Sequence, residues 1–467
     1  MLVKNTMKWL GLGLIQLALI NPTSANEPAE GVNETKKDTG VFTVGAQIRP
    51  RFEYRHGFKE PLADGLKPAA FVEQRTRLWF DYKNSKFHMH VNVQDVRMWG
   101  STGQIYKTDP SMFNVYEAFG EYYINHNWSM KVGRQALDYD NARFFGNLDW
   151  AQQGRSHDAF LLRYNNKAAK FKADAGISFN QAQNEPSYLN YQPYLGSNGQ
   201  PMGNYKMMYF LWANKAWDKM DVSFVFNNDG REKGFDTTIV NRQTLGLIPT
   251  YKSGKWKFAL EAYYQMGETA GAAEENNKVS AYFVAFNATY KTKLTPITIG
   301  ADFASGNAHD ADANTENGWN PLYGTNHKFY GFMDYFYVGN AHGQNNGSTG
   351  LIDIYGKTNF QLGQSKKHFL LAHLHYFMSP VELLDLTSID PDATVSSGLG
   401  TEIDLVYKFV ISKGVVANIG YSQMFATDSM KQIKNQANVI NGYTETGMNN
   451  WMWAQVNFST EFFKFKK

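Results

Sequence analysis

Alternation of apolar and polar side chains over short segments is the feature of this sequence that most constrains its fold. Residues 42–55 show it most clearly, because apolar and ionic residues fall on opposite faces of an extended chain. One face would carry Phe42, Val44, Ala46, Ile48, Phe52 and Tyr54, and the other Thr43, Gln47, Arg49, Arg51, Glu53 and Arg55. Since half-buried soluble sheets alternate as well, alternation alone predicts strands but not the kind of sheet.

Connection lengths decide which kind of sheet these strands form. Eighteen alternating segments can be counted, at 42–55, 70–83, 86–99, 113–125, 127–135, 157–165, 169–181, 205–217, 219–229, 237–252, 254–267, 277–291, 296–305, 348–362, 367–379, 399–410, 414–426 and 449–463. Connections after even-numbered segments are all short, whereas those after odd-numbered segments are mostly long. Outer-membrane barrels have this asymmetry and an even strand number. The sequence therefore predicts an all-β fold, a transmembrane antiparallel up-and-down β-barrel of about 18 strands.

Composition agrees with a barrel better than with a helical membrane protein. Aromatic residues make up 15% of the 467 residues. No stretch after residue 25 approaches the roughly 18 apolar residues that a spanning helix needs. The absence of cysteine excludes disulfide bonds, a lipid-anchored cysteine and thiol catalysis. The net charge of +3 is too small to indicate a class of partner.

The first 25 residues are typical of a secretory signal peptide. Lys4 and Lys8 supply the positive n-region, residues 9–20 the apolar h-region, and residues 23–25 a cleavage site of small side chains. Residues 26–40 are polar, and we expect them to form a disordered lead-in to a barrel at 41–467. A signal peptide followed by a barrel predicts the bacterial outer membrane as the location.

Arginine is unevenly distributed, with ten of the twelve arginines in the first 163 residues. Consecutive strands are neighbours in a barrel, so we expect one basic wall of the pore. Guanidinium groups bind carboxylates through two parallel hydrogen bonds, and nearby acids would keep each contact weak enough for conduction. The candidate pore-lining and substrate-binding residues are Arg49, Arg51, Arg75, Arg77, Arg134, Arg143, Arg155, Arg163, Glu73, Asp138 and Asp158. Structural ion networks that fill the barrel are the alternative interpretation.

Residues 133–155 form a long loop that is rich in charged and aromatic side chains, and we expect it to fold inward. The loop contains GRQ after a strand, then FFG and DWAQQGR, and a later loop contains WNPLYGTNHKFYG. These motifs resemble those of the alginate-export family of outer-membrane barrels. The resemblance implies a basic pore that passes an anionic polyuronate, with Arg134 and Arg155 at its constriction. Aromatic residues of these loops could stack on sugars or pack among themselves; they are Phe144, Phe145, Trp150, Trp319 and Tyr323.

Three groups of residues have the character of metal ligands. They are the strand pairs His88/His90 and His373/His375 and the loop residues Asp310, Asp312, Asn314 and Glu316. Imidazoles in a polar lumen need no metal. The acidic loop lacks the spacing of an EF-hand, so a solvated loop is the simpler interpretation and calcium the alternative. We therefore predict no metal and no cofactor.

The motifs of common enzymes do not occur, since the chain has no G-x-S-x-G, no P-loop and no G-x-G-x-x-G between a strand and a helix. Inward arginines offer no surface to nucleic acid. We predict a monomeric, passive outer-membrane channel for anionic, uronate-type, alginate-like saccharides, surrounded by lipid. Two alternatives stay open. A general or small-carboxylate anion porin would share the arginines, and a non-conducting surface-binding barrel would use the long loops.

Overall fold

The structure is a computed structural model that describes residues 39–101, 103, 113–181, 205–232, 238–270, 276–340, 342–344, 347–434 and 447–466. The predicted signal peptide and most of the predicted lead-in lie outside the described residues.

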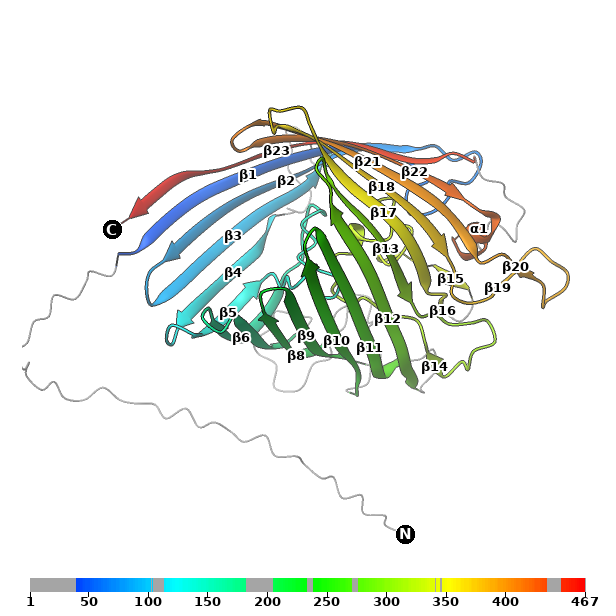
Figure 1. The fold of residues 1–467 in the computed structure, drawn as a ribbon, viewed down its shortest axis with the longest axis horizontal. Helices are drawn as coiled ribbons and strands as arrows, with labels where there is room; N and C mark the ends of the chain where they lie inside the picture. The colour runs from blue at the N-terminus through cyan, green and yellow to red at the C-terminus, as the bar shows by residue number, and fades with distance from the viewer. Residues whose placement is uncertain are drawn as a thin grey trace, which may run out of the picture. The chain divides into compact units, whose positions relative to one another are not determined.

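Eighteen long strands form one closed antiparallel barrel, as the sequence predicts (Figure 1). They are β1 (Val41–His56), β2 (Ala69–Lys83), β3 (Phe87–Met98), β4 (Phe113–Tyr123), β5 (Trp128–Gln135), β6 (His157–Asn166), β7 (Phe171–Phe179), β8 (Met207–Ala216), β9 (Met220–Glu232), β10 (Ile239–Ser253), β11 (Trp256–Ala270), β12 (Asn276–Lys291), β13 (Pro296–Ala304), β17 (Leu351–Leu362), β18 (His368–Met378), β21 (Gly398–Ser412), β22 (Val415–Ala426) and β23 (Asn449–Lys466). Each predicted segment corresponds to one strand, and the ends agree within three residues.

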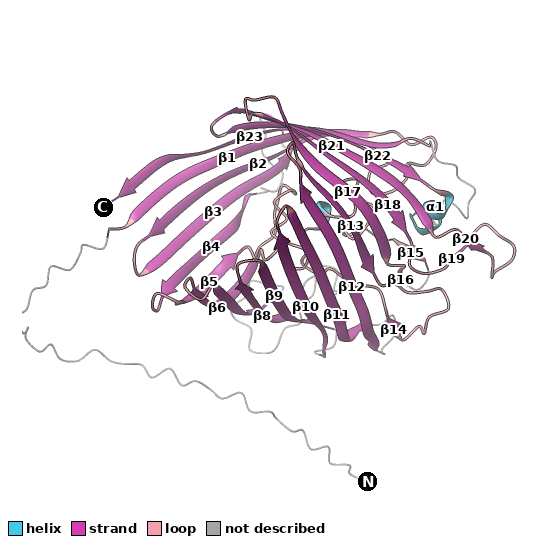
Figure 2. Ribbon diagram, viewed as in Figure 1, coloured by secondary structure: helices cyan, strands magenta, loops and turns pink. Residues whose placement is uncertain are grey.

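The barrel closes because its first and last strands pair, with Val41 opposite Lys466 and Arg55 opposite Trp451. Closure leaves no free strand edge, so every backbone amide and carbonyl of the wall can be paired inside a bilayer. The remaining elements lie in the loops (Figure 2). They are β14 (Thr315–Glu316), β15 (Gly343–Gln344), β16 (Gly347–Ser348), β19 (Leu383–Leu384), β20 (Thr394–Val395), η1 (Asn326–Lys328) and α1 (Asp428–Lys434). No helix in the described ranges is long and apolar enough to cross a membrane.

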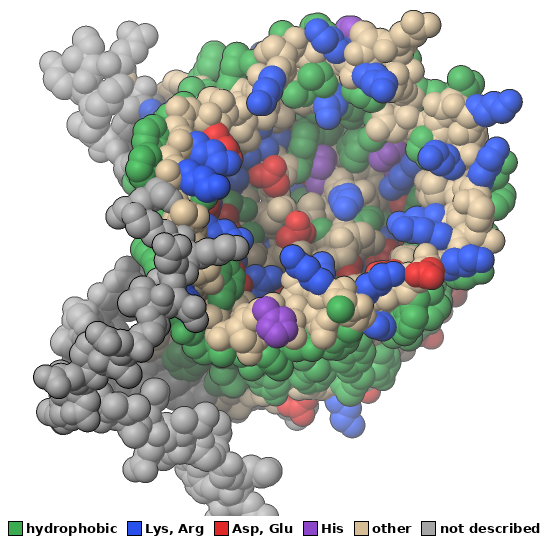
Figure 3. All heavy atoms as spheres, turned by 60° about the vertical axis from the view of Figure 1, so that its left-hand side comes forward, with side chains coloured by type: hydrophobic (Ala, Val, Ile, Leu, Met, Phe, Trp, Pro, Cys, Tyr) green, Lys and Arg blue, Asp and Glu red, His purple; other side chains and the backbone are tan. Residues whose placement is uncertain are grey.

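The two faces of the barrel wall differ in polarity. Outward side chains are large and apolar, and those of Ile48, Phe286 and Ile299 are 45%, 50% and 61% exposed. Inward positions on the same sheet carry buried polar groups such as Arg49 and Asp302. Figure 3 shows apolar side chains over the outer wall and basic side chains around a hollow mouth. An apolar outer belt and a polar lumen are what a strand wall in lipid requires.

The core lies inside the barrel, where two long loops pack against the inward face of the wall. The loop of residues 136–156 follows β5, and the loop of residues 305–350 follows β13. They meet at a β-bridge between Phe145 and Tyr323, beside a hydrogen bond of 2.9 Å from the Gly146 amide to the Tyr323 carbonyl. The first loop therefore folds into the barrel, as the sequence predicts.

Gly133 lies near the end of β5, two residues before the strand ends at Gln135. Its φ is 122°, a conformation that side-chain-bearing residues rarely adopt. A Cβ at this position would lie 2.2 Å from the carbonyl oxygen of Ala118 on the neighbouring strand β4. Both the backbone conformation and the neighbouring strand therefore require glycine at the first position of the GRQ motif.

Replacing Gly133 with alanine should destabilise the barrel by about 1–3 kcal/mol, because the strained backbone and the clash with Ala118 must both be relieved. Gly120→Ala is the matched control, since an added Cβ at Gly120 meets nothing within 4 Å. Urea midpoints, read from the mobility of unheated samples on denaturing gels, measure both effects. Equal midpoints for the two variants would contradict the requirement for glycine at position 133.

Candidate functional site

A cavity of about 900 Å³ lies among the inward side chains and the infolded loops, at the end of the barrel that carries the long loops. Its basic lining residues are Arg51, Arg55, Lys59, Arg155, Arg231 and Arg242. Its acidic lining residues are Glu53, Glu73, Glu316 and Asp334. Because the described lining carries more basic than acidic groups, the cavity favours an anion.

The inward arginines of β1 and β2 hold the first loop; they are Arg49, Arg51, Arg75 and Arg77. The first three donate to carbonyl oxygens of the loop, and Arg77 donates to the carboxylate of Asp149. Arg49 Nη1 donates to the carbonyl oxygen of Asp149 at 2.8 Å, and Arg51 Nη1 donates to that of Trp150 at 2.9 Å. All four residues are at most 7% exposed. The predicted arginine wall exists and faces the loop, but many of its donors are already engaged by protein oxygens.

Asp149 balances much of this positive charge. Its carboxylate lies 3.0 Å from Arg75, 3.3 Å from Arg77 and 3.6 Å from Arg49. Burial alone would raise the pKa of Asp149, but the three guanidinium groups, led by Arg75, hold it below its usual value. Asp149 therefore remains ionised at neutral pH. Its side chain is 54% exposed, so it also faces the open part of the lumen.

Glu73, a predicted site residue, lines the cavity and forms an ion pair with Arg51. Glu53 lies between Arg51 and Arg55, at 2.8 Å from each, and accepts a hydrogen bond of 3.0 Å from the indole of Trp451. The acids therefore fix the guanidinium groups on this wall. They also limit how strongly the wall could attract a further anion.

Arg143 does not line the cavity, contrary to its prediction. Its side chain is 1% exposed and lies 2.7 Å from Asp302 and 3.2 Å from Glu261. Its Nη1 also donates to the hydroxyl of Tyr330 at 3.0 Å. The interpretation as a structural ion network, left open by the sequence, applies to this residue. It joins the first loop to β11, β13 and the second loop.

Arg134 and Asp158 do not line the pore, although both were predicted to do so. They pair at 2.8 Å, and Arg134 has the same strand parity as the exposed residues Met130 and Val132 on β5. The pair therefore lies on the outer face of the wall, not in the lumen. The resemblance implies that Arg134 lies at the constriction, whereas the alternation of β5 places it on the outer face.

Two other predicted residues lie apart from the cavity. Arg163 faces inward on β6, where it pairs with Glu121 at 3.1 Å and Asp174 at 3.2 Å. Asp138 is an exposed residue of the first loop and accepts a hydrogen bond of 3.2 Å from Asn147. Neither is among the residues that line the cavity.

Arg155 and Arg242 differ from the other arginines, since neither has an ion pair with any described residue. Arg155 Nη1 donates to the carbonyl oxygens of Tyr323 and Gly324, and burial lowers the pKa of Arg155 to about 10, so the group stays charged at neutral pH. Arg242 faces the cavity from β10 and is 8% exposed. The sequence predicted Arg155 but missed Arg242, which only barrel closure brings close to the N-terminal arginines.

The aromatic residues of the two loops pack mainly against each other and the wall. Phe145 and Tyr323 stack at 5.5 Å, and Trp319 is 1% exposed. The ring of Trp150 has Arg51 at 4.2 Å and His327 stacked at 4.5 Å. The sequence left two alternatives for these rings, stacking on sugars or packing among themselves. Their contacts favour packing among themselves.

Lysines from distant strands gather near the opposite mouth, where the turns are short. Alternation along the strands places the following lysines on inward faces: Lys83, Lys131, Lys172, Lys252, Lys257, Lys291 and Lys408. Figure 3 shows basic side chains around this opening. Sequence reasoning concentrated on arginine and missed this ring, because its members are brought together only by closure of the barrel.

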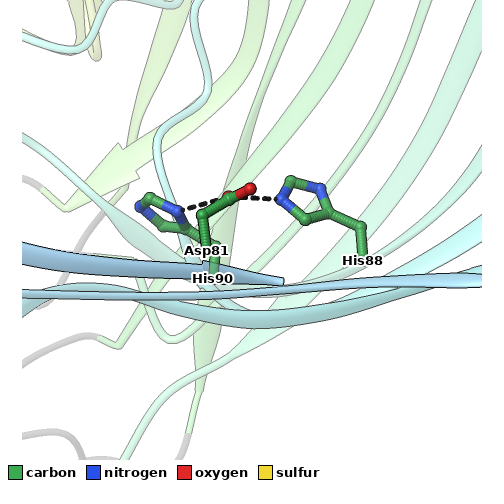
Figure 4. Close-up of side chains that lie close together, drawn as sticks. All are labelled: Asp81, His88 and His90. Carbon is green, nitrogen blue, oxygen red and sulfur yellow. Dashed lines mark hydrogen bonds and ion pairs between the residues drawn. The ribbon is translucent and has the colours of Figure 1, made fainter. Parts of the chain in front are cut away.

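The N-terminal histidine pair forms a cluster with Asp81 in the lumen (Figure 4). One carboxylate oxygen of Asp81 lies 2.6 Å from His88 Nε2 and 3.0 Å from His90 Nδ1. In the loop proposed as a calcium alternative, Asp312 accepts a bond of 3.0 Å from the Asn314 amide. That carboxylate is thus turned toward its own backbone, and calcium binding there stays a prediction.

Residues 41–439 match the family described as alginate export. The chain belongs to this family. Family and fold together make it a channel of the bacterial outer membrane, and they indicate a transporter rather than an enzyme. No curated protein matches the sequence.

Solved outer-membrane porins share the fold. OccAB1 of Acinetobacter baumannii has a TM-score of 0.57 and 12% identity, over 90% of this chain and 97% of that one. OccD3 (OpdP) of Pseudomonas aeruginosa has a TM-score of 0.55 and 11% identity, over 90% and 92%. OpdK of Pseudomonas aeruginosa with vanillate has a TM-score of 0.55 and 10% identity, over 90% and 99%. At these identities the likeness concerns the fold alone.

A buried neutral histidine belongs to the second loop and lines the cavity. His342 is 5% exposed, and its Nδ1 donates to the carbonyl oxygen of Asn340 at 3.3 Å, so its Nε2 accepts from the hydroxyl of Ser348 at 3.1 Å. Burial, and then the charge of Lys434, lower the pKa of His342 to about 3. His342 therefore stays neutral in the folded loop at pH values where an unfolded histidine would be protonated.

Replacing Asp149 with asparagine should increase anion selectivity, because three guanidinium groups lose their shared carboxylate. The reversal potential of the channel in a salt gradient measures this change. Asp64→Asn is the control, since it removes the same charge from an exposed loop position without an ion pair among the described residues. An equal shift in both variants, or none in Asp149→Asn, would contradict the role of Asp149 in the lumen.

Acidification from pH 7 to 5 should loosen the second loop around His342. Its folded pKa of about 3 lies below the ordinary value of 6.5, so the opened loop binds more protons in this window and stability falls with pH. The loss at pH 5 is about 2 kcal/mol. Hydrogen exchange in residues 330–340, corrected for intrinsic rates, measures it. His342→Gln should remove most of this pH dependence, and an unchanged dependence would assign it to other groups.

Proposed function

We propose that this barrel is a passive channel for anionic, uronate-type saccharides. The observation that carries the proposal is that Arg155 and Arg242 line a cavity of about 900 Å³ without an ion pair to any described residue. A sugar carboxylate can accept two parallel hydrogen bonds from a guanidinium group. The two groups would thus replace water around the carboxylates of a passing chain.

The remaining charges of the lumen support conduction rather than tight capture. Inward lysines at the short-turn mouth would raise the local concentration of an anion. Asp149 and Glu73 would oppose binding beside the arginines, and conduction requires sites that are weak enough to release their occupant. Membership of the alginate export family supports a uronate as the carboxylate in question.

A small-carboxylate porin is the second candidate. The structural neighbour OpdK was crystallised with vanillate, which is a small aromatic carboxylate. Arg155 and Arg242 could bind the single carboxylate of a small molecule as readily as the repeated carboxylates of a polyuronate. A non-conducting barrel that binds ligands with its loops is the third alternative, and it predicts no current.

The proposal is tested by single-channel recording of the purified protein with added oligouronates. Arg155→Gln and Arg242→Gln should each weaken block by oligouronates about tenfold, the size expected for one charged hydrogen-bonding group. Arg134→Gln is the matched control, because it removes an arginine from the outer face of the same barrel.

Neutral oligosaccharides of equal length serve as the ligand control. They should block weakly in all of these proteins. Block by short carboxylates alone would favour the small-carboxylate porin, and absence of current would favour the binding barrel. Unchanged oligouronate block in both lumen variants would overturn the role given to the two arginines.

A further inference from the structure

The second histidine pair lies in a buried polar cluster on β18 and β21 that the channel function does not use. His373, His375 and Asp404 each present one ligand atom, and these atoms lie within 4.8 Å of one another. His375 and Asp404 are both 0% exposed. Two imidazole nitrogens and a carboxylate oxygen are a common donor set for zinc and related divalent cations.

The donor atoms of this cluster have no hydrogen-bond partner among the described residues. With the acids ionised, these atoms are His373 Nδ1, His375 Nε2, Asp404 Oδ2 and Glu402 Oε2. Glu402 and Asp404 hydrogen-bond to each other when one of the two carboxyls carries a proton. A buried polar atom without a partner typically costs about 1–3 kcal/mol. Such atoms are rare in folded proteins, so three within 4.8 Å of one another call for a shared partner.

His375 is oriented as a metal ligand would be. Its Nδ1 lies 2.9 Å from both carboxylate oxygens of Asp353, and a carboxylate accepts, so Nδ1 carries the proton. In the neutral imidazole the lone pair is then on Nε2, which faces Asp404 at 4.0 Å. A carboxylate behind a histidine is the usual outer-shell arrangement at zinc sites, where it fixes the tautomer.

The local charge also calls for a cation. Asp353, Glu402 and Asp404 are each 0% exposed, and none has an arginine or lysine within ion-pair distance in the described part of the chain. Lys357 is near, but its ammonium lies over the ring of Tyr355, 4.3 Å from the centroid. Each carboxylate accepts a hydrogen bond, Asp353 from His375, Glu402 from the Met333 amide and Asp404 from the Ser422 hydroxyl at 2.5 Å. Buried carboxylates without a balancing cation are nevertheless strongly destabilising unless they are protonated or coordinate a metal.

We propose that His373, His375 and Asp404 bind a divalent transition-metal ion, with zinc as the best match. The ion satisfies the three ligand atoms at once and neutralises part of the charge. Beside the site, the main-chain amide of Met333 donates to Glu402 Oε1 at 2.8 Å and joins the second loop to the barrel wall.

The cluster of Asp81, His88 and His90 in Figure 4 provides the contrast. It has the same His-x-His spacing on a strand. However, Asp81 occupies one nitrogen of each histidine with a hydrogen bond, at 2.6 and 3.0 Å, and the three side chains are partly exposed to the lumen. His90→Gln is therefore a matched control for substitutions in the buried cluster.

The test uses the full-length barrel in detergent, stripped with a chelator and dialysed against metal-free buffer. Titration with Zn²⁺ alone, followed by calorimetry and elemental analysis, should give one tightly bound ion per chain. Co²⁺ should give the visible absorption of a four-coordinate site. Asp404→Asn and His375→Gln should abolish stoichiometric binding, and Asp353→Asn should weaken it by roughly 10- to 100-fold as an outer-shell change.

His90→Gln should leave the tight ion in place. Gel mobility without heating checks that each variant is a folded barrel, and should His375→Gln misfold, Asp404→Asn and Asp353→Asn carry the test. Absence of stoichiometric Zn²⁺ uptake by the wild-type barrel would overturn the proposal and leave a shared proton or water as the partner. Loss of the ion in His90→Gln alone would also overturn it, in favour of the lumen cluster.

Discussion

Hydrogen bonds from inward arginines to loop carbonyls hold the interior of this barrel together. A loop that folds into a barrel lies outside the pairing of the strands, yet its buried carbonyls still need donors. Arg49 and Arg51 provide them for residues 149–151. The position of the first loop depends on these contacts, and that loop forms one side of the cavity. Removing the donors would leave the carbonyl groups of residues 149–151 buried without these partners.

This arrangement separates the arginines into two kinds. On β1 and β2, Arg49, Arg75 and Arg77 share the carboxylate of Asp149, and Arg51 pairs with Glu53 and Glu73, so their charge is largely used within the protein. Arg155 and Arg242 lack such a carboxylate among the described residues, and they face the cavity. A count of arginines alone cannot make this distinction. The number of basic groups available to an anion is smaller than the sequence suggests.

The sequence predicts the strands well because the barrel wall is governed by a local rule. Outward positions within the hydrocarbon band must be apolar, and this imposes the same period on all eighteen strands. Side-chain partners obey no such rule. Arg143 meets Glu261 and Asp302, more than a hundred residues away, and no sequence pattern links them. Arg134 differs from Arg143, because its position does follow from the local rule. It alternates with Met130 and Val132 on β5, and this pattern predicts the outer face.

Basic and acidic side chains occupy different parts of the lumen wall. Because of this separation, cation binding in one part can affect anion passage in another. Arg49 and Arg75 belong to the sector of β1 and β2, whereas Asp353 and Asp404 belong to the sector from β17 to β21. In a poorly screened interior, negative charge in one sector repels an anion in another. A divalent cation at His373, His375 and Asp404 would reduce that repulsion. If the bound cation then raises the affinity for an anion, the anion must raise the affinity for the cation by the same factor.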